Sequence, residues 1–225
     1  MKEGKLILLS IPIGNPKDIT ERSIQDLKEC DFVIGEEFKE TSKFLKQISI
    51  QKDFELFNEH STNDDLLGLL ERVKRSNKVC LISDSGTPTL EDPGQKFVEI
   101  ALKNKIPVSA DPGASALMVA LSICGFPTSP FTFTGFLSRD NITRFKQLKK
   151  FFALNHTIAI YETPYRYKKV IQEISKILQP NRKIFLGLNL TCPDEFIFRG
   201  ELKGILPILE KLPKSPPVIV ISPEK

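Results

Sequence analysis

Residues Ser83–Gly94 read SDSGTPTLEDPG and stand between a short apolar run and a helical pattern. A comparable loop, SIPIGNPKDIT at Ser10–Thr20, follows the first apolar run of the chain. Loops in these positions lie at the carboxyl ends of strands, where open α/β sheets bind their ligands. Neither loop has the glycine spacing of an ordinary dinucleotide site or of a P-loop. Two unusual strand-end loops in one chain therefore indicate a specialised ligand.

The first half of the chain alternates short apolar or β-branched runs with helical patterns. Such runs are typical of buried parallel strands, so we predict an α/β domain with a mostly parallel sheet. The expected strands are Leu6–Ile11, Asp31–Ile34, Val79–Ser83 and Pro107–Ala110. The expected helices are Thr20–Glu29, Glu40–Gln47, Asn63–Arg75 and Gln95–Asn104.

The second half predicts another α/β domain, with a mixed sheet. Its expected strands are Phe131–Phe136, Thr157–Tyr161, Lys183–Leu188, Glu195–Phe198 and Pro217–Ser222. Its expected helices are Ala114–Cys124, Asn141–Phe152, Arg166–Leu178 and Lys203–Leu209. Two strands follow each other near residues 185 and 197, which favours antiparallel pairing there. We place the domains at 1–113 and 114–225, whereas turn content alone would put the boundary at Gly125–Pro130.

The composition excludes several classes of protein. Hydrophobic residues make up 40% of the 225 residues, enough for a real core, but no apolar run approaches the roughly 20 residues of a membrane span. Pro12 and Gly14 interrupt the apolar N-terminal run too early for a signal peptide, so we expect a cytoplasmic protein. The four cysteines are far apart and there are two histidines. We therefore expect neither a metal site nor a histidine-dependent hydrolase.

Five motifs occur in the order found in the tetrapyrrole methylase superfamily. They are PIGN with DIT, SDSGTP with DPG, PGASALMVALS with G-x-PT, F-x-GFL, and YETPYR. Within that superfamily the chain most resembles the bacterial small-subunit (16S) rRNA cytidine 2′-O-ribose methyltransferases, from Leu6 to about Gly200. The resemblance implies two α/β domains with a cofactor cleft between them, S-adenosylmethionine as methyl donor, and a homodimer.

The resemblance also implies a set of residues that contact the methyl donor. They are Ile13, Gly14, Ser85, Gly86, Thr87, Leu90, Ser115, Ala116, Glu162 and Leu190. Glycines in such loops let the backbone approach a ligand closely or adopt positive φ. The sulfonium of the donor loses its charge as the methyl group leaves, so a desolvated site without strong anions near the sulfur favours the transition state.

The chain departs from the rRNA methyltransferase pattern at several places. The family's acidic pair is followed by Thr-Arg-His-Thr, whereas this chain has Glu36 and Glu37 followed by Phe-Lys-Glu-Thr. The family's Glu-Leu-Thr-Lys is Asn-Leu-Thr-Cys at Asn189–Cys192, and its PGPS is PGAS. The small C-terminal helical module of typical members has no counterpart after the last expected strand.

Positive charge is concentrated in the second half. Between Arg139 and Lys183 there are eleven Lys or Arg residues against three acids, and tyrosines are interleaved with them at Tyr165 and Tyr167. Such a face suits phosphate contacts and base stacking, while the alternative is a pair of solvated helix faces. The expected RNA contacts are Arg139, Arg144, Lys149, Lys150, Arg166 and Lys168, and the expected partner is rRNA or the small ribosomal subunit.

Methylation of a hydroxyl needs a proton acceptor, and the sequence offers several carboxylates at strand ends. Glu36, Glu37 and Asp84 are the candidates, with Glu162 as a further possibility. Each has a structural alternative: Asp84 can brace its turn, and the two glutamates can simply begin a helix. His60 is more consistent with a structural role. The catalytic base therefore stays unassigned.

Three hypotheses follow. The leading hypothesis is an S-adenosylmethionine-dependent methyltransferase that acts on a ribose 2′-hydroxyl of small-subunit rRNA. The second is a methyltransferase for a small, tetrapyrrole-like molecule, against which the basic second half and the PIGN-type loop argue. The third is a non-catalytic paralogue that binds RNA or the cofactor, which the intact cofactor loops disfavour.

Overall fold

The computed structural model describes residues 4–224, which divide into two compact units. The first unit ends at Ser115 and the second begins at Ala116. The turn-rich segment Gly125–Pro130 lies inside the second unit, so turn content alone puts the division in the wrong place.

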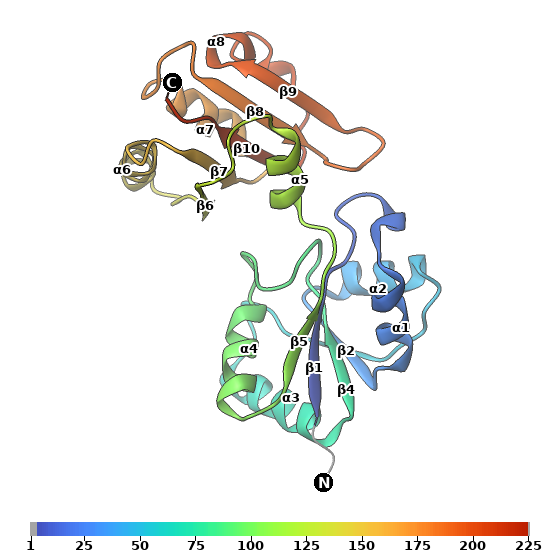
Figure 1. Ribbon diagram of the computed structural model, residues 1–225. Helices are drawn as coiled ribbons and strands as arrows, with labels where there is room; N and C mark the ends of the chain where they lie inside the picture. The colour runs from blue at the N-terminus through green and yellow to red at the C-terminus, as the bar shows by residue number, and fades with distance from the viewer. Residues whose placement is uncertain (1–3, 225) are drawn as a thin grey trace. The chain divides into compact units, whose positions relative to one another are not determined.

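The first unit is a three-layer α/β/α sandwich (Figure 1). Its strands are β1 (Lys5–Leu9), β2 (Phe32–Gly35), β3 (Phe54–Leu56), β4 (Lys78–Leu81) and β5 (Val108–Asp111). Its helices are the 3-10 turn η1 (Pro16–Asp18) with α1 (Glu21–Glu29), α2 (Phe38–Gln47), α3 (Asn63–Arg75) and α4 (Gly94–Lys103). The strand order is β3-β2-β4-β1-β5, and every pair is parallel.

The two faces of this sheet carry separate hydrophobic cores. On one face Leu27 of α1 and Phe44 of α2 pack with Leu9 and Val33, and on the other face α3 and α4 cover alternate residues of the same strands. This alternation follows from the side-chain period of two in a strand.

The strand order places a topological switch between β1 and β4. The chain leaves β1 through α1 to reach β2, and it leaves β4 through α4 to reach β5, on the opposite face of the sheet. Adjacent parallel strands whose helices depart on opposite faces open a crevice at their carboxyl ends. The loops singled out in the sequence, Ser10–Thr20 and Ser83–Gly94, follow these two strands.

The second unit is built on a mixed sheet. Its strands are β6 (Phe131–Phe136), β7 (Thr157–Tyr161), β8 (Lys183–Leu188), β9 (Phe196–Glu201) and β10 (Pro217–Ile221). Its helices are α5 (Ala116–Ile123), α6 (Asn141–Phe152), α7 (Tyr167–Ile174), α8 (Leu202–Ile205) and the 3-10 turn η2 (Leu209–Lys211). The strand order is β6-β7-β10-β8-β9, and β6 with β7 is the parallel pair.

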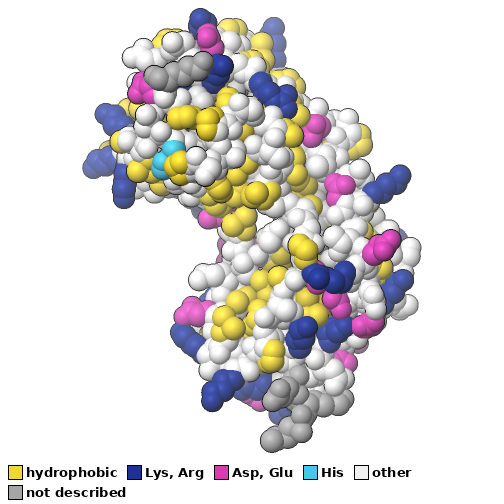
Figure 2. All heavy atoms as spheres, in the orientation of Figure 1, with side chains coloured by type: hydrophobic (Ala, Val, Ile, Leu, Met, Phe, Trp, Pro, Cys, Tyr) yellow, Lys and Arg dark blue, Asp and Glu magenta, His cyan; other side chains and the backbone are white. Residues whose placement is uncertain are grey.

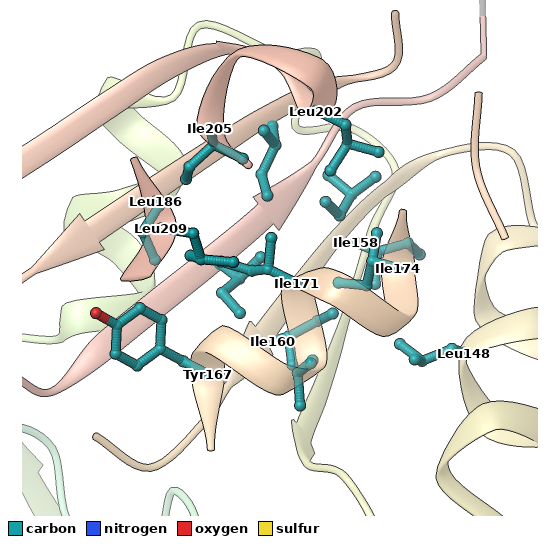
Figure 3. Packing of buried hydrophobic residues seen from close by; sticks show 14 of the residues in the cluster. Leu148, Ile158, Ile160, Tyr167, Ile171, Ile174, Leu186, Leu202, Ile205 and Leu209 are labelled. Atoms are coloured by element: carbon teal, nitrogen blue, oxygen red, sulfur yellow. The ribbon is translucent and has the colours of Figure 1, made fainter. Parts of the chain in front are cut away.

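One face of the mixed sheet holds the main core of the second unit. Ile160, Leu186 and Ile219 from the strands pack against Ile171 and Leu148 from the helices. Figure 3 shows this cluster at close range, with the Tyr167 ring packed at its margin. The core fixes β7 and β10 in the middle of the sheet, and so fixes the loops at their ends.

The fold class predicted from the sequence is confirmed, and the differences have local causes. The adjacent strands near residues 185 and 197 pair antiparallel, as expected. The edge strand β3 has no counterpart among the expected strands, because two of its three residues are exposed and leave no apolar run. The helix expected at Lys203–Leu209 is broken into α8 and η2 at Pro207, since proline removes a helical hydrogen bond. Helix α7 ends at Ile174, before the expected Leu178.

Candidate active site

The loops after β1, β4 and β5 are joined to one another by hydrogen bonds. The Ile11 amide donates to the Gly86 carbonyl at 2.9 Å. The Ser10 hydroxyl donates to Thr87 Oγ1 at 3.1 Å, and the Thr87 hydroxyl donates to the Ala114 carbonyl at 3.0 Å. These bonds connect loops distant in sequence into one surface at the carboxyl edge of the sheet. The structure thus brings together the predicted site residues of the first unit.

Two glycines permit this close approach. Gly86 has a φ of +79°, and a Cβ at that position would lie 3.1 Å from the Ile13 side chain. A Cβ on Gly113 would lie 2.8 Å from the Cβ of Ser10. A side chain at either position would therefore strain or separate the loops. Ser85 and Thr87 on both sides of the buried Gly86 are exposed. The Thr87 hydroxyl is bonded to Ser10 and Ala114, whereas the Ser85 hydroxyl faces solvent or a ligand.

Asp92 braces the far end of the β4 loop. Its carboxylate accepts hydrogen bonds from the Thr89 amide at 2.6 Å and from the Gly94 amide at 2.8 Å. Thr89 and Glu91 adopt positive φ values of 72° and 70°, which is uncommon for residues other than glycine. Half-buried Leu90 lies between them and is held in this unusual turn. Backbone strain of this kind is concentrated at functional sites.

The three carboxylate candidates lie together at the ends of β2 and β4. Asp84 Oδ1 accepts a hydrogen bond from the Glu37 amide at 3.2 Å, and Glu36 Oε2 accepts one from the Asp84 amide at 3.4 Å. Burial, together with the charge of Asp84, raises the pKa of Glu36 to about 7. Burial also raises the pKa of Asp84. Glu37 is exposed, so the environments of these carboxylates differ.

Asp111 at the end of β5 is a site neighbour that sequence reasoning missed. Its Oδ1 lies 2.8 Å from Nε of Arg22 in α1, and Arg22 Nη2 donates to the Ala110 carbonyl at 3.2 Å. This ion pair ties α1 to the turn that carries Gly113. An Asp that directly follows an expected strand and precedes Pro-Gly was the available signal.

In the second unit the predicted donor contacts lie near the carboxyl end of β7. The Leu117 amide at the start of α5, next to Ala116, donates to the Tyr161 hydroxyl at 2.8 Å. Glu162 follows Tyr161 directly. The Leu190 side chain is buried against Gly187, so only the backbone of Leu190 is available to a ligand.

The structure argues against Glu162 as a proton acceptor. Its side chain is fully buried, and Oε1 and Oε2 accept hydrogen bonds from Arg166 Nε and Nη2 at 2.8 and 2.7 Å. Oε1 also accepts a bond from the Thr163 amide at 2.7 Å. A carboxylate engaged on both oxygens by a guanidinium is a structural clamp for the YETPYR turn.

Arg144 has to be removed from the expected RNA contacts. Its side chain is 1% exposed and forms a bidentate ion pair with Glu173, at 2.6 and 2.7 Å. Its guanidinium also donates to the carbonyls of Ser138 and Arg139 and to Asn141 Oδ1. Arg144 is therefore an internal brace of α6. Tyr167 is likewise a core residue whose hydroxyl bonds the Pro213 carbonyl, so it is unavailable for base stacking.

The other expected RNA contacts differ in whether their charged groups are exposed or already bonded within the protein. Arg139, Lys149 and Lys150 are exposed, and Figure 2 shows Lys and Arg side chains gathered at the α6 side of the second unit. Arg166 is committed to Glu162, and half-buried Lys168 donates to the Glu210 carbonyl at 2.7 Å. The α6 lysines with Arg139 thus form the accessible part of the set.

Residues 4–224 contain neither a metal-binding cluster nor a membrane span. No three His, Cys, Asp or Glu side chains of this part of the chain lie together as a metal site requires. No helix among the same residues is long and apolar enough to cross a membrane.

A family model described as Tetrapyrrole (Corrin/Porphyrin) Methylases matches residues 5–206. The chain belongs to this family. The predicted methyltransferase is thereby confirmed, and the match covers the β1, β4 and β5 loops together with the YETPYR turn.

The chain is also similar to curated proteins named ribosomal RNA small subunit methyltransferase I. The protein from Leptospira borgpetersenii is 46% identical over 226 residues, which cover 99% of this chain and 89% of the relative. The protein from Thermotoga maritima is 35% identical over 210 residues, with 92% and 93% covered. The expected relationship to the rRNA methyltransferases is therefore confirmed.

Solved structures agree on the fold. A crystal structure of diphthine synthase matches with a TM-score of 0.75 at 14% identity, over 98% of this chain and 91% of that chain. Uroporphyrin-III C-methyl transferase from Thermus thermophilus, complexed with S-adenyl homocysteine, matches with a TM-score of 0.68 at 15% identity, over 97% of each chain. At identities of 14% and 15% the likeness shows a shared fold and nothing more.

Proposed function

We propose that this chain transfers a methyl group from S-adenosylmethionine to a ribose 2′-hydroxyl of small-subunit rRNA. The observation that carries the proposal is the 46% identity, over nearly the whole chain, to a protein named ribosomal RNA small subunit methyltransferase I. The methylase family model and the joined strand-end loops support it independently.

The loop surface of the first unit fits the methyl donor chemically. The groups that it offers are backbone amides and carbonyls and the Ser85 hydroxyl, which can bind polar groups of the donor. The close approach at Gly86 and Gly113 lets the three loops pack into one surface. When bound, S-adenosylmethionine supplies an electrophilic methyl group. The proposed contacts of this unit are Ile13, Gly14, Ser85, Gly86, Thr87, Leu90 and Ser115.

The predicted contacts of the second unit are more restricted. Ala116 is the first residue of α5, and its contact with the donor stays a prediction. Glu162 and Leu190 have buried side chains, and Glu162 is engaged by Arg166. We therefore propose that these two positions contribute backbone atoms only.

We propose Glu36 as the proton acceptor for the ribose hydroxyl. Its half-buried carboxylate has a pKa of about 7, which suits a general base near neutral pH. Asp84 is occupied with holding the Glu37 amide, and the Glu37 side chain is exposed to solvent. The loops align the hydroxyl, and Glu36 takes its proton as the methyl group is transferred.

The RNA contacts that we propose are Arg139, Lys149 and Lys150, because these are exposed at α6. Lysines neutralise phosphates without reading sequence, so they would position the RNA while other groups select the nucleotide. We also propose a homodimer, as the family resemblance implies. Light scattering on the purified chain measures its mass directly and tests that part.

The test is methyl transfer from radiolabelled S-adenosylmethionine, with free small-subunit rRNA and isolated small subunits as acceptors. We expect label in the RNA, lost in Gly86→Ala, and donor binding measurable by calorimetry. Donor binding with no label in either acceptor would contradict the rRNA proposal and favour a small-molecule acceptor or an inactive paralogue. Absence of donor binding would contradict the proposed cofactor itself.

A further inference from the structure

Tyr165 is the most exposed large hydrophobic side chain of the described residues, at 82% exposure. It stands at the tip of the YETPYR turn, next to residues that are tightly held. Arg166 is clamped to the buried Glu162 carboxylate, and its Nη2 also donates to the Leu137 carbonyl at 2.8 Å. Tyr167 is anchored in the core. The turn is therefore rigid while the ring that it carries faces solvent.

A second loop supports the same ring. The Tyr167 hydroxyl donates to the Pro213 carbonyl at 2.6 Å, which ties the turn to the loop before β10. The next residue, Lys214, places Nζ 5.6 Å from the centre of the Tyr165 ring. Both loops lie at one edge of the mixed sheet, because Tyr161 at the end of β7 is paired with Val218 near the start of β10. The Lys214 ammonium thus lies over one face of the Tyr165 ring, and the 82% exposure of the side chain leaves the ring open to a ligand.

This edge of the sheet also carries the predicted donor contacts of the second unit. Glu162 begins the Tyr165 turn, and Leu190 lies in the loop after β8, whose end pairs with the start of β10. The Asn189 amide donates to the Pro216 carbonyl at 3.1 Å, which links that loop to the Lys214 segment. A ligand on Tyr165 would therefore lie close to residues expected at the methyl donor.

We propose that Tyr165 is a stacking platform for an unpaired base of the RNA substrate, with Lys214 binding an adjacent phosphate. This inference rests on the proposed function and deepens it by naming where a flipped or single-stranded nucleotide is held. A rigid turn lowers the entropic cost of ordering the ring on binding. Every nucleobase has a π face that can stack on a tyrosine, and the neighbouring cation suits its phosphate.

The charge of the surroundings favours RNA over a protein partner. The charged group that lies against the ring is the Lys214 ammonium, while the neighbouring Arg166 is paired with Glu162. Lys168 and Lys169 follow within the same short segment. Protein interfaces bury aromatic residues within an apolar centre, whereas single-stranded nucleic acid is bound by aromatic rings set in a positively charged groove.

The test compares Tyr165→Ala and Tyr165→Phe with the wild-type chain and with Leu154→Ala. Leu154 is 48% exposed and precedes β7, at the opposite end of the strand from Tyr165, so it controls for loss of an exposed apolar side chain. The measurements are the KM for free rRNA, the KM for intact small subunits, and the Kd of S-adenosylmethionine by calorimetry. Thermal unfolding is recorded for each variant.

We expect Tyr165→Ala to raise the KM for free rRNA about 5- to 150-fold, the range that loss of one stacked base predicts. Tyr165→Phe keeps a ring and should stay within about threefold of wild type, as should Leu154→Ala. The Kd of the donor should not change in any variant. Lys214→Gln should lower the slope of log K against log salt by about 0.7, the value for one phosphate on a single strand.

Each other outcome overturns the inference. An unchanged KM in Tyr165→Ala, with a wild-type chain that methylates rRNA, removes the platform and leaves the proposed function intact. An equal loss in Tyr165→Phe assigns the effect to the hydroxyl. A KM raised for intact subunits but not for free rRNA would show that Tyr165 contacts a ribosomal protein instead of the RNA. A wild-type chain that neither binds nor methylates rRNA overturns the proposed function together with the inference.

Discussion

The Ser10 hydroxyl donates a hydrogen bond to Thr87 Oγ1 at 3.1 Å, across 77 positions of sequence. The Thr87 hydroxyl in turn donates a hydrogen bond to the Ala114 carbonyl. The loops that follow β1, β4 and β5 therefore form one hydrogen-bonded surface. A substitution that moves one loop should also shift the positions of the other two. This coupling is the structural basis of the donor site that we propose.

Gly86→Ala should weaken binding of the methyl donor. Alanine is strained at a φ of +79°, and its Cβ would press on the Ile13 side chain. We expect about 10- to 100-fold weaker donor binding by calorimetry, because small displacements in a positioned site are costly, and a stability loss of about 1–2 kcal/mol. Gly68→Ala in α3 is the matched control, since a Cβ added there would meet no atom within 4 Å. That control should stabilise the chain by roughly 0.5–1 kcal/mol.

Glu36 predicts a pH dependence of activity. With a pKa of about 7, its carboxyl is protonated at acid pH and cannot accept the ribose proton. We expect kcat to rise as the pH passes through about 7 and then to level off. Glu36→Gln should lower kcat about 10²- to 10⁴-fold and abolish this limb of the pH profile. Glu37→Gln, at the exposed neighbour, should leave the limb in place; an unaltered profile in Glu36→Gln would contradict the assignment.

The raised pKa of Glu36 also predicts that the stability of the chain depends on pH. The folded-state pKa of Glu36 is raised above its ordinary value of 4.5, so the folded state binds this proton more tightly than the unfolded state. Below pH 4.5 the group is protonated in both states and the folded state has its full stability. That stability falls as the pH rises from 4.5 through about 7, because the folded state must then give up a proton that it holds more tightly. Glu36→Gln removes the cost of ionising a buried group. It should therefore be more stable than wild type at pH 8, by about 1–3 kcal/mol, with a smaller difference at pH 5.

Arg144→Met should destabilise the chain without weakening RNA binding in what remains folded. Removing one partner of a buried ion pair leaves Glu173 uncompensated, at a cost of about 3–5 kcal/mol. The double variant Arg144→Met with Glu173→Leu should recover much of that loss, which denaturant unfolding measures. A direct effect on the affinity for RNA, in a variant of wild-type stability, would restore Arg144 to the RNA contacts.

Lys149→Gln and Lys150→Gln should weaken RNA binding in a salt-dependent manner. Each exposed lysine that contacts a phosphate contributes about 0.7–0.9 to the slope of log K against log salt. The measurement is fluorescence anisotropy with labelled rRNA between low and moderate salt. Lys103→Gln in α4 is the charge-matched control; equal slopes in all three variants would contradict a specific role for α6.

Much of the fold could be predicted from the sequence because local signals agree with the final structure. Helix α3 begins and ends where predicted, since Thr62 and Asp65 form a capping box. Asp140 caps α6 through the Thr143 amide. Strands β6, β7 and β8 are apolar runs bounded by turns and also match. The short edge strand β3 has no such signal, because neighbouring β2 supplies its pairing.

The candidate site was less predictable, since its geometry depends on contacts between distant elements. The resemblance identified the loops, but no local pattern could pair Arg144 with Glu173 in another helix. Glu162 and Arg166 are four positions apart, but the burial of their ion pair depends on how the turn packs. A signal did exist for Arg144: it lies one helical turn before buried Leu148, on the apolar stripe of α6. Tyr167 similarly begins the buried stripe of α7. Composition alone places both residues in a basic, RNA-facing segment.

The most direct measurement of the central claim is the chemical position of the transferred methyl group. Small-subunit rRNA labelled by the chain from radiolabelled S-adenosylmethionine is hydrolysed with alkali, which cleaves only next to free 2′-hydroxyls. The account predicts label in alkali-resistant dinucleotides, at a single position in the RNA, and its loss in Glu36→Gln. Label recovered in mononucleotides would show methylation of a base and would contradict ribose 2′-O-methylation.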